Sequence, residues 1–176
     1  MRRFAIVAAV LPATLAGLAL AALLPLPLAA QEARANFLNA EGQPAGSATL
    51  TSAPGGVLIA VEARGLPRES WVGFHIHEAG SCDHTTGHDS AGGHFNPAGT
   101  EHGYHTETGP HAGDMPNIWV DHAGILRAQV FNPHIVLTDG ESSALGRALM
   151  IHAGTDDYRS QPSGNAGDRL ACAVIE

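Results

Sequence analysis

Two histidines, His75 and His77, lie one residue apart in the short apolar run GFHIHE at residues 73–78. Side chains alternate between the two faces of a β-strand, so a strand here places both imidazoles on one face. Such a pair alone is more often two ordinary hydrogen-bonded histidines than a binding site. Several imidazoles without a thiolate, however, suit a copper ion that changes oxidation state. His152, at the end of another apolar run, offers a third ligand of this type.

A second group of potential ligands lies in a polar stretch rich in Gly and His, at residues 79–116. His94, His102, His111 and Asp114 fall within 21 residues of one another. Three imidazoles and one carboxylate complete a tetrahedral shell for Zn²⁺ and leave no position open, as in structural zinc sites. Four ligands from one loop also explain how a polar segment becomes ordered without a core of its own.

The elements that position these ligands are expected to be short β-strands. No segment sustains a helical period, and 21 glycines and 11 prolines interrupt the chain. The strand-like runs are residues 47–51, 57–63, 71–78, 117–121, 125–131, 148–152 and 170–175. This pattern predicts an all-β fold, a sandwich or a barrel. The stretches 79–116 and 153–168 lack strand character and are predicted to be two long functional loops.

The N-terminal segment 1–30 has the composition of a secretory signal peptide. Arg2 and Arg3 precede an uncharged run rich in Ala and Leu, and small residues permit cleavage near residue 30 or 35. An uncleaved membrane anchor is the alternative because the run is long, although its three prolines disfavour a spanning helix. We therefore expect a periplasmic or secreted protein, which is membrane-anchored only if the leader is retained.

The mature chain is expected to be one acidic domain. Residues 31–44 are polar with scattered apolar positions and are expected to form an N-terminal tail, followed by the domain at 45–176. Without the leader the chain has seven arginines, no lysine and 17 acidic residues, so its charge is near −10 with His neutral. This charge excludes nucleic acid as a partner. It also repels small anions unless positive charge is focused locally.

The chain has two cysteines, Cys82 and Cys172. Export permits a disulfide, and two cysteines allow only one, which would close a loop of about 90 residues. Two buried free thiols are the alternative.

Five stretches of the sequence, in order, resemble the copper/zinc superoxide dismutase family, specifically its bacterial, exported members. They are GFHIHE (73–78), SAGGHFNP (90–97), HAGD (111–114), IHAGTDD (151–157) and GNAGDRLACAVIE (164–176). The similarity extends from about residue 45 to the C-terminus. It implies a Greek-key β-sandwich or barrel of about eight antiparallel strands. It also implies an oxidoreductase that converts two superoxide anions and two protons to dioxygen and hydrogen peroxide by redox cycling of copper, beside a zinc ion.

The resemblance assigns the potential ligands to two adjacent ions. The copper ligands are His75, His77, His94 and His152. The zinc ligands are His94, His102, His111 and Asp114. His94 is shared as an imidazolate, and the resemblance also gives it a catalytic role in proton transfer.

Four further residues receive roles from the resemblance. Asp156 hydrogen-bonds His75 on the copper side and His102 on the zinc side, which fixes the orientation of ligand rings. Arg169 draws superoxide toward the copper. Cys82 and Cys172 form the disulfide that ties the ligand-bearing loop to the last strand.

The segment between Cys82 and His94 is longer than in eukaryotic relatives and contains His84 and His88. We expect a solvated loop, and an auxiliary metal site or a dimer contact is the alternative. The histidines that match no family ligand are expected at the surface: His105, His122 and His134.

The main competing function is a non-catalytic periplasmic copper or zinc protein, for buffering or delivery, on the same fold. A zinc-stabilised adhesion or structural domain is a third reading, because fold alone does not settle function. The complete ligand sets together with Asp156 and Arg169 favour the dismutase, since a buffer has no need of the arginine. Superoxide is the expected substrate, and the resemblance allows either a monomer or a homodimer.

Overall fold

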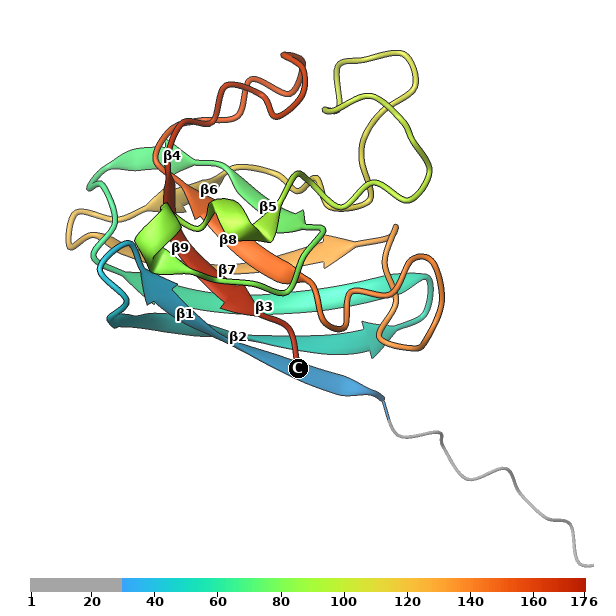
Figure 1. Ribbon diagram of the computed structural model, residues 1–176, viewed down its shortest axis with the longest axis horizontal. Coiled ribbons are helices and arrows are strands. Elements are labelled where there is room, and N and C mark those ends of the chain that lie inside the picture. Colours follow the sequence, from blue (N-terminus) through green and yellow to red (C-terminus); the bar gives the residue numbers. More distant parts are fainter. Residues whose placement is uncertain (1–29) are drawn as a thin grey trace, which may run out of the picture.

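The computed structural model describes residues 30–176, which form a nine-stranded antiparallel sheet that curls into a barrel (Figure 1). The strands are β1 (Glu32–Asn39), β2 (Pro44–Ala53), β3 (Gly56–Arg64), β4 (Ser70–Val72), β5 (Phe74–His77), β6 (Ile118–Val120), β7 (Ile125–Asn132), β8 (Ala148–His152) and β9 (Arg169–Val174). Nearly all of the predicted leader lies outside the described residues. Within the described part of the chain, no helix has the length and apolar character that crossing a membrane requires.

The strand order around the sheet is β4-β6-β7-β3-β2-β1-β9-β8-β5. The two edge strands, β4 and β5, follow one another in the chain with only Gly73 between them. The two edges of the sheet therefore meet at this residue, and the barrel is nearly closed. A Cβ atom on Gly73 would lie 2.9 Å from the Cβ of Ala166, which explains why a glycine occupies this junction. The prediction of an all-β Greek-key barrel is therefore confirmed, with the expected run 71–78 divided into two strands.

Strand β1 occupies most of the segment that we expected to be an N-terminal tail, and the structure differs here from the prediction. β1 pairs with β2 from Glu32↔Thr51 onward and reaches β9 through Leu38↔Cys172. Its buried positions alternate with exposed ones, as a strand with one face on the core requires. Two of the three buried side chains are alanines, which have low strand propensity, and this conceals the strand in the sequence.

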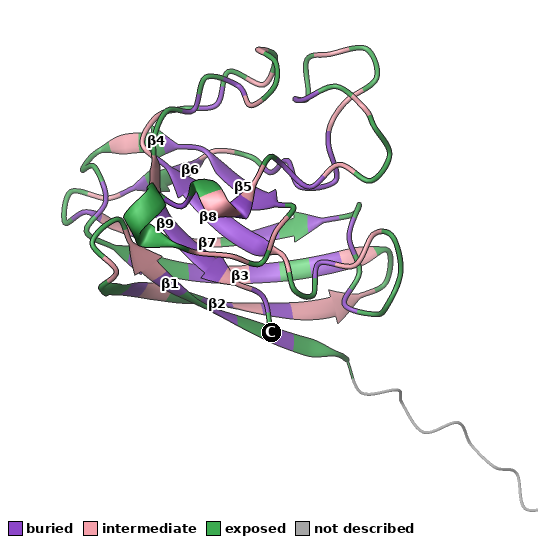
Figure 2. Cartoon of the chain, viewed as in Figure 1, coloured by how far each residue is buried: buried purple, intermediate pink, exposed green. Residues whose placement is uncertain are grey.

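Strands β5 and β8 are buried along their whole length, unlike the alternating outer strands (Figure 2). Phe74 and Ile76 of β5 belong to the barrel core, together with Leu149 and Ile151 of β8. The opposite face of β5 carries the two histidines. Since that face is also buried, something other than the core must cover it.

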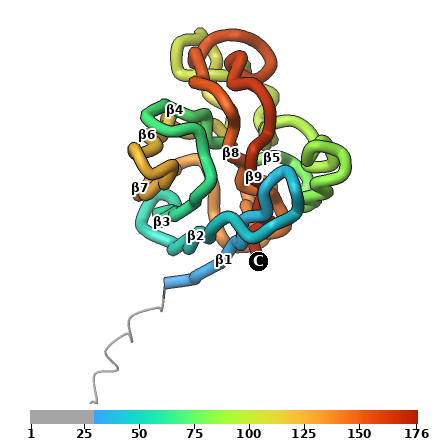
Figure 3. The backbone as a smooth tube through the Cα atoms, turned by 90° about the vertical axis from the view of Figure 1, so that its left-hand side faces the viewer, coloured from blue at the N-terminus to red at the C-terminus, as the bar shows by residue number. Residues whose placement is uncertain are grey.

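The cover consists of the two long loops. The first contains only two short 3₁₀ helices, η1 (His84–Thr86) and η2 (Asp89–Ala91), and the second has no regular element. Both rise from the same end of the barrel and lie together there (Figure 3). Gln161 of the second loop joins the two loops through its side chain. The side chain accepts a hydrogen bond from the backbone N–H of His102 in the first loop and donates one to the carbonyl oxygen of His102. The prediction of two long loops is confirmed.

Candidate metal centre

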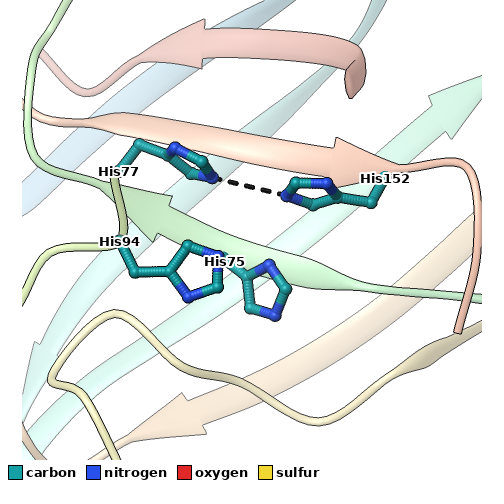
Figure 4. Close-up of side chains that lie close together, drawn as sticks. All are labelled: His75, His77, His94 and His152. Atoms are coloured by element: carbon teal, nitrogen blue, oxygen red, sulfur yellow. Dashed lines mark hydrogen bonds between the residues drawn. The ribbon is translucent and has the colours of Figure 1, made fainter. Parts of the chain in front are cut away.

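Four buried histidine rings converge beside β5 and β8 (Figure 4). His75 and His77 come from β5 and His152 from the end of β8. His94 comes from the first loop, whose backbone forms an isolated bridge from His94 to His77. One nitrogen from each ring lies within 4.8 Å of the others. The four imidazoles are therefore close enough together to bind one metal ion.

In three of these rings one nitrogen is fixed by the protein and the other faces the centre. His77 donates from Nδ1 to the carbonyl oxygen of Gly92 at 2.9 Å, and His152 donates from Nδ1 to that of Gly167 at 3.2 Å. The remaining nitrogens, both Nε2, face each other at 3.3 Å. The ring of His75 is fixed instead by a carboxylate, at Nε2.

Two nitrogens at this centre are buried without a hydrogen-bond partner: Nδ1 of His75 and Nε2 of His94. Buried polar atoms are nearly always paired, so two unpaired nitrogens that face the same point fit a site that binds a metal ion. Burial, opposed in part by hydrogen bonds, lowers the pKa of His75 to about 3, that of His77 to about 2 and that of His152 to about 4. These rings stay neutral, as metal binding requires.

A second donor group surrounds Asp114. Its Oδ1 lies 2.8 Å from Nδ1 of His94, 3.1 Å from Nδ1 of His102 and 3.4 Å from Nδ1 of His111. Its Oδ2 accepts hydrogen bonds from the N–H groups of Gly103 and His111. Burial alone would raise the pKa of Asp114, but hydrogen bonds from the surrounding histidines hold it well below its usual range. The carboxylate is ionised, and the donor set suits zinc.

His94 belongs to both groups. Its Nδ1 faces Asp114 and its Nε2 points to the four-histidine centre. The structure thus brings together all seven predicted ligand side chains as two adjacent sets with one shared ring. Within the described residues these two sets are the groups of three or more donors that could hold a metal ion.

Asp156 connects the two sets from outside. Its Oδ2 lies 2.8 Å from Nε2 of His75, and its Oδ1 lies 3.0 Å from Nε2 of His102. Burial would raise the pKa of Asp156, but these two imidazoles hold it far below its usual range. Burial would lower the pKa of His102, but Asp114 and Asp156 on either side raise it to about 9.

The residues that hold Asp156 in place were not predicted. Asn117 pairs with its backbone, accepting from its N–H at 2.8 Å and donating to its carbonyl oxygen at 2.9 Å. The N–H of Tyr158 donates to Oδ1. Gly164 passes so close that a Cβ there would collide with Oδ1. Only this glycine had a signal in the sequence, as part of the motif at 164–176.

Arg169, the first residue of β9, sits beside the four-histidine centre, paired across the sheet with His152. Its Nη1 donates to the carbonyl oxygen of His88 and its Nη2 to that of Gly92, both at 2.8 Å. The Gly92 oxygen also accepts from His77, so one peptide group holds both a ligand ring and the guanidinium. The loop is tied to β9 by the disulfide Cys82–Cys172.

The remaining histidines fall into two groups. His105, His122 and His134 are exposed, as expected. In the segment that we expected to be solvated, His84 is exposed but His88 is fully buried. The local sequence is polar and gave no sign of this burial, which results from packing of the loop against the barrel.

Together, the fold and the site define a β-barrel protein with two adjacent sets of metal-binding side chains that share a histidine. A family model described as copper/zinc superoxide dismutase matches residues 44–175. The chain belongs to the copper/zinc superoxide dismutase family.

Named relatives and solved structures agree with this assignment. A copper/zinc superoxide dismutase of Aquifex aeolicus is 51% identical over 148 residues, which cover 82% of this chain and 86% of that protein. The structure of the Brucella abortus copper/zinc superoxide dismutase superposes with a TM-score of 0.69 at 31% identity, covering 83% of this chain and all of that one. A double mutant of a SOD-like protein from Bacillus subtilis gives a TM-score of 0.77 at 39% identity, covering 80% and 94% of the two chains.

Proposed function

We propose that this protein is a superoxide dismutase that works with copper and zinc. Membership of the family supports the activity and the two metals. The observation that carries the assignment of ligands is the pair of donor sets that share His94. Copper is assigned to the four-histidine set, which has only imidazole donors, and zinc to the set with Asp114.

Copper, when bound, supplies one-electron redox chemistry, in which one superoxide is oxidised to dioxygen and a second is reduced to hydrogen peroxide. The chain's own residues bring substrate and protons to it. His94 holds or releases a proton at Nε2, while its Nδ1 stays fixed on the zinc side. Arg169 presents a positive charge beside the centre. This local charge attracts the superoxide anion, which the net negative charge of the chain would otherwise repel.

The assay that tests the function combines metal analysis with superoxide kinetics on the mature protein. We expect bound copper and zinc together with dismutation that depends on copper. Bound copper without dismutation would favour a metal buffer or delivery protein, the alternative function on this fold.

Replacing Arg169 by glutamine should slow dismutation several-fold and flatten its dependence on ionic strength, because the charge that attracts the anion is lost. Metal content should not change, since among residues 30–176 the guanidinium donates hydrogen bonds only to backbone carbonyls. Stopped-flow kinetics across a range of salt concentrations measures both effects. Unaltered kinetics would remove Arg169 from the proposed mechanism.

Export to the periplasm or the cell exterior is part of this proposal, with membrane anchoring if the leader is retained. The leader-like composition of residues 1–30 supports it, as does a disulfide, which persists in oxidising compartments. The acidic charge gives no reason to propose a nucleic-acid partner.

We also infer a homodimer formed through β4 and β6. Trp71 and Trp119 lie on these paired strands and are 52% and 45% exposed. Their rings pack edge to face, with 5.5 Å between the ring centroids. Aromatic side chains are enriched at protein interfaces, and exposed apolar patches often mark them, which supports a contact through this pair. Trp119→Glu should convert a dimer to a monomer in analytical ultracentrifugation. A wild-type protein that is monomeric at micromolar concentration would refute the inference.

A further inference from the structure

Arg169 is surrounded by one short turn of the first loop. Its three side-chain nitrogens face three groups of this turn: Nη1 the carbonyl of His88, Nη2 the carbonyl of Gly92, and Nε the carboxylate of Asp89. The two carbonyl contacts are 2.8 Å long, and the distance from Nε to Oδ1 of Asp89 is 3.8 Å. η2, capped by His88 and Gly92, supplies all three groups.

These contacts affect the guanidinium in different ways. The carbonyls are neutral, so they orient it and leave its charge in place. The carboxylate carries a full negative charge, which opposes the field that Arg169 presents to an approaching anion. The side chain of Asp89 is 81% exposed, and it makes no hydrogen bond within the described residues. Its main physical effect on the site is therefore electrostatic.

We propose that Asp89 sets the rate of superoxide capture by partly cancelling the charge of Arg169. This inference rests on the proposed role of Arg169. The chain has no lysine, so no lysine offsets a carboxylate that opposes Arg169. Within the described residues the side chain of Asp89 makes no hydrogen bond to a metal-ligand residue, so it acts on the centre through its charge.

The test compares Asp89→Asn with Glu62→Gln. Glu62 also pairs with an arginine, Arg127, but it lies on β3, which β2 and β1 separate from β9 in the sheet. Both variants therefore remove one negative charge and one ion pair. With rates normalised to copper content, Asp89→Asn should be about twofold faster than wild type at low ionic strength, and the gain should vanish at high salt. Glu62→Gln should stay near wild type throughout.

Two further variants separate this inference from the function on which it rests. Asp89→Glu keeps the charge and should show no gain. In an Arg169→Gln background, adding Asp89→Asn should still speed dismutation more than adding Glu62→Gln does, because the field of the carboxylate adds to that of the arginine and does not depend on it. If Arg169→Gln alone leaves the rate unchanged, the proposed role of the arginine fails.

If Arg169→Gln slows the enzyme, the remaining outcomes decide on Asp89. An Asp89→Asn variant that matches Glu62→Gln at every salt concentration, or that is slower than wild type, overturns the inference. A gain from Asp89→Asn that is the same at every salt concentration also overturns it, because salt screens an electrostatic effect.

Discussion

Replacing Asp156 by asparagine should weaken copper and zinc binding together, each by about 10- to 100-fold. The carboxylate accepts hydrogen bonds from His75 of one set and from His102 of the other, with one oxygen for each ring. Asparagine has a single side-chain oxygen, so it cannot replace both acceptors. Both rings would then lose the partner that fixes their orientation. Competition against chelators of known affinity, starting from metal-free protein, measures the two constants separately.

A matched control is Asp139→Asn, which removes the same charge at an exposed position whose side chain makes no hydrogen bond within residues 30–176. Its affinities for both metals should equal those of the wild type. If Asp156→Asn weakened one metal only, the carboxylate would not couple the two sites. Asn117→Ala should act in the same direction but less strongly, because it loosens only the backbone of Asp156.

Removing the disulfide with Cys82→Ala and Cys172→Ala should lower the free energy of unfolding of the metal-free protein by about 4 to 5 kcal/mol. The two cysteines are 90 residues apart in sequence, and a cross-link across so long a loop strongly restricts the unfolded chain. Denaturant unfolding of metal-free protein measures the loss without a contribution from bound ions.

The substitutions also remove buried atoms, since Cys172 is fully buried beside Met150 and Ala148. Wild-type protein unfolded in the presence of a reductant separates the two effects, because it loses the cross-link and keeps both side chains. Reduced and oxidised wild type of equal stability would show that the cross-link contributes nothing. The reduced protein should also lose activity, because the disulfide anchors the loop that holds Arg169.

The sequence allowed most of the strands and all seven clustered ligand side chains to be predicted, for identifiable reasons. Ligands are rare residue types in fixed motifs, and strands such as β3 and β7 have strongly apolar alternation. β1 was missed because its inward residues are mostly alanine. Asn117 and His88 were missed because their roles depend on contacts with segments far away in the chain, which local pattern does not contain.

The pairing of β1 with β9 bears on how the protein acquires its shape. These strands lie at opposite ends of the described chain, and Arg34 and Glu176 exchange backbone hydrogen bonds in both directions. β1 can pair with β2 early, but its other edge has no partner until β9 has been synthesised. Contacts of such high sequence separation form slowly. Completion of the barrel is therefore a late event, because it requires β9 to have been synthesised.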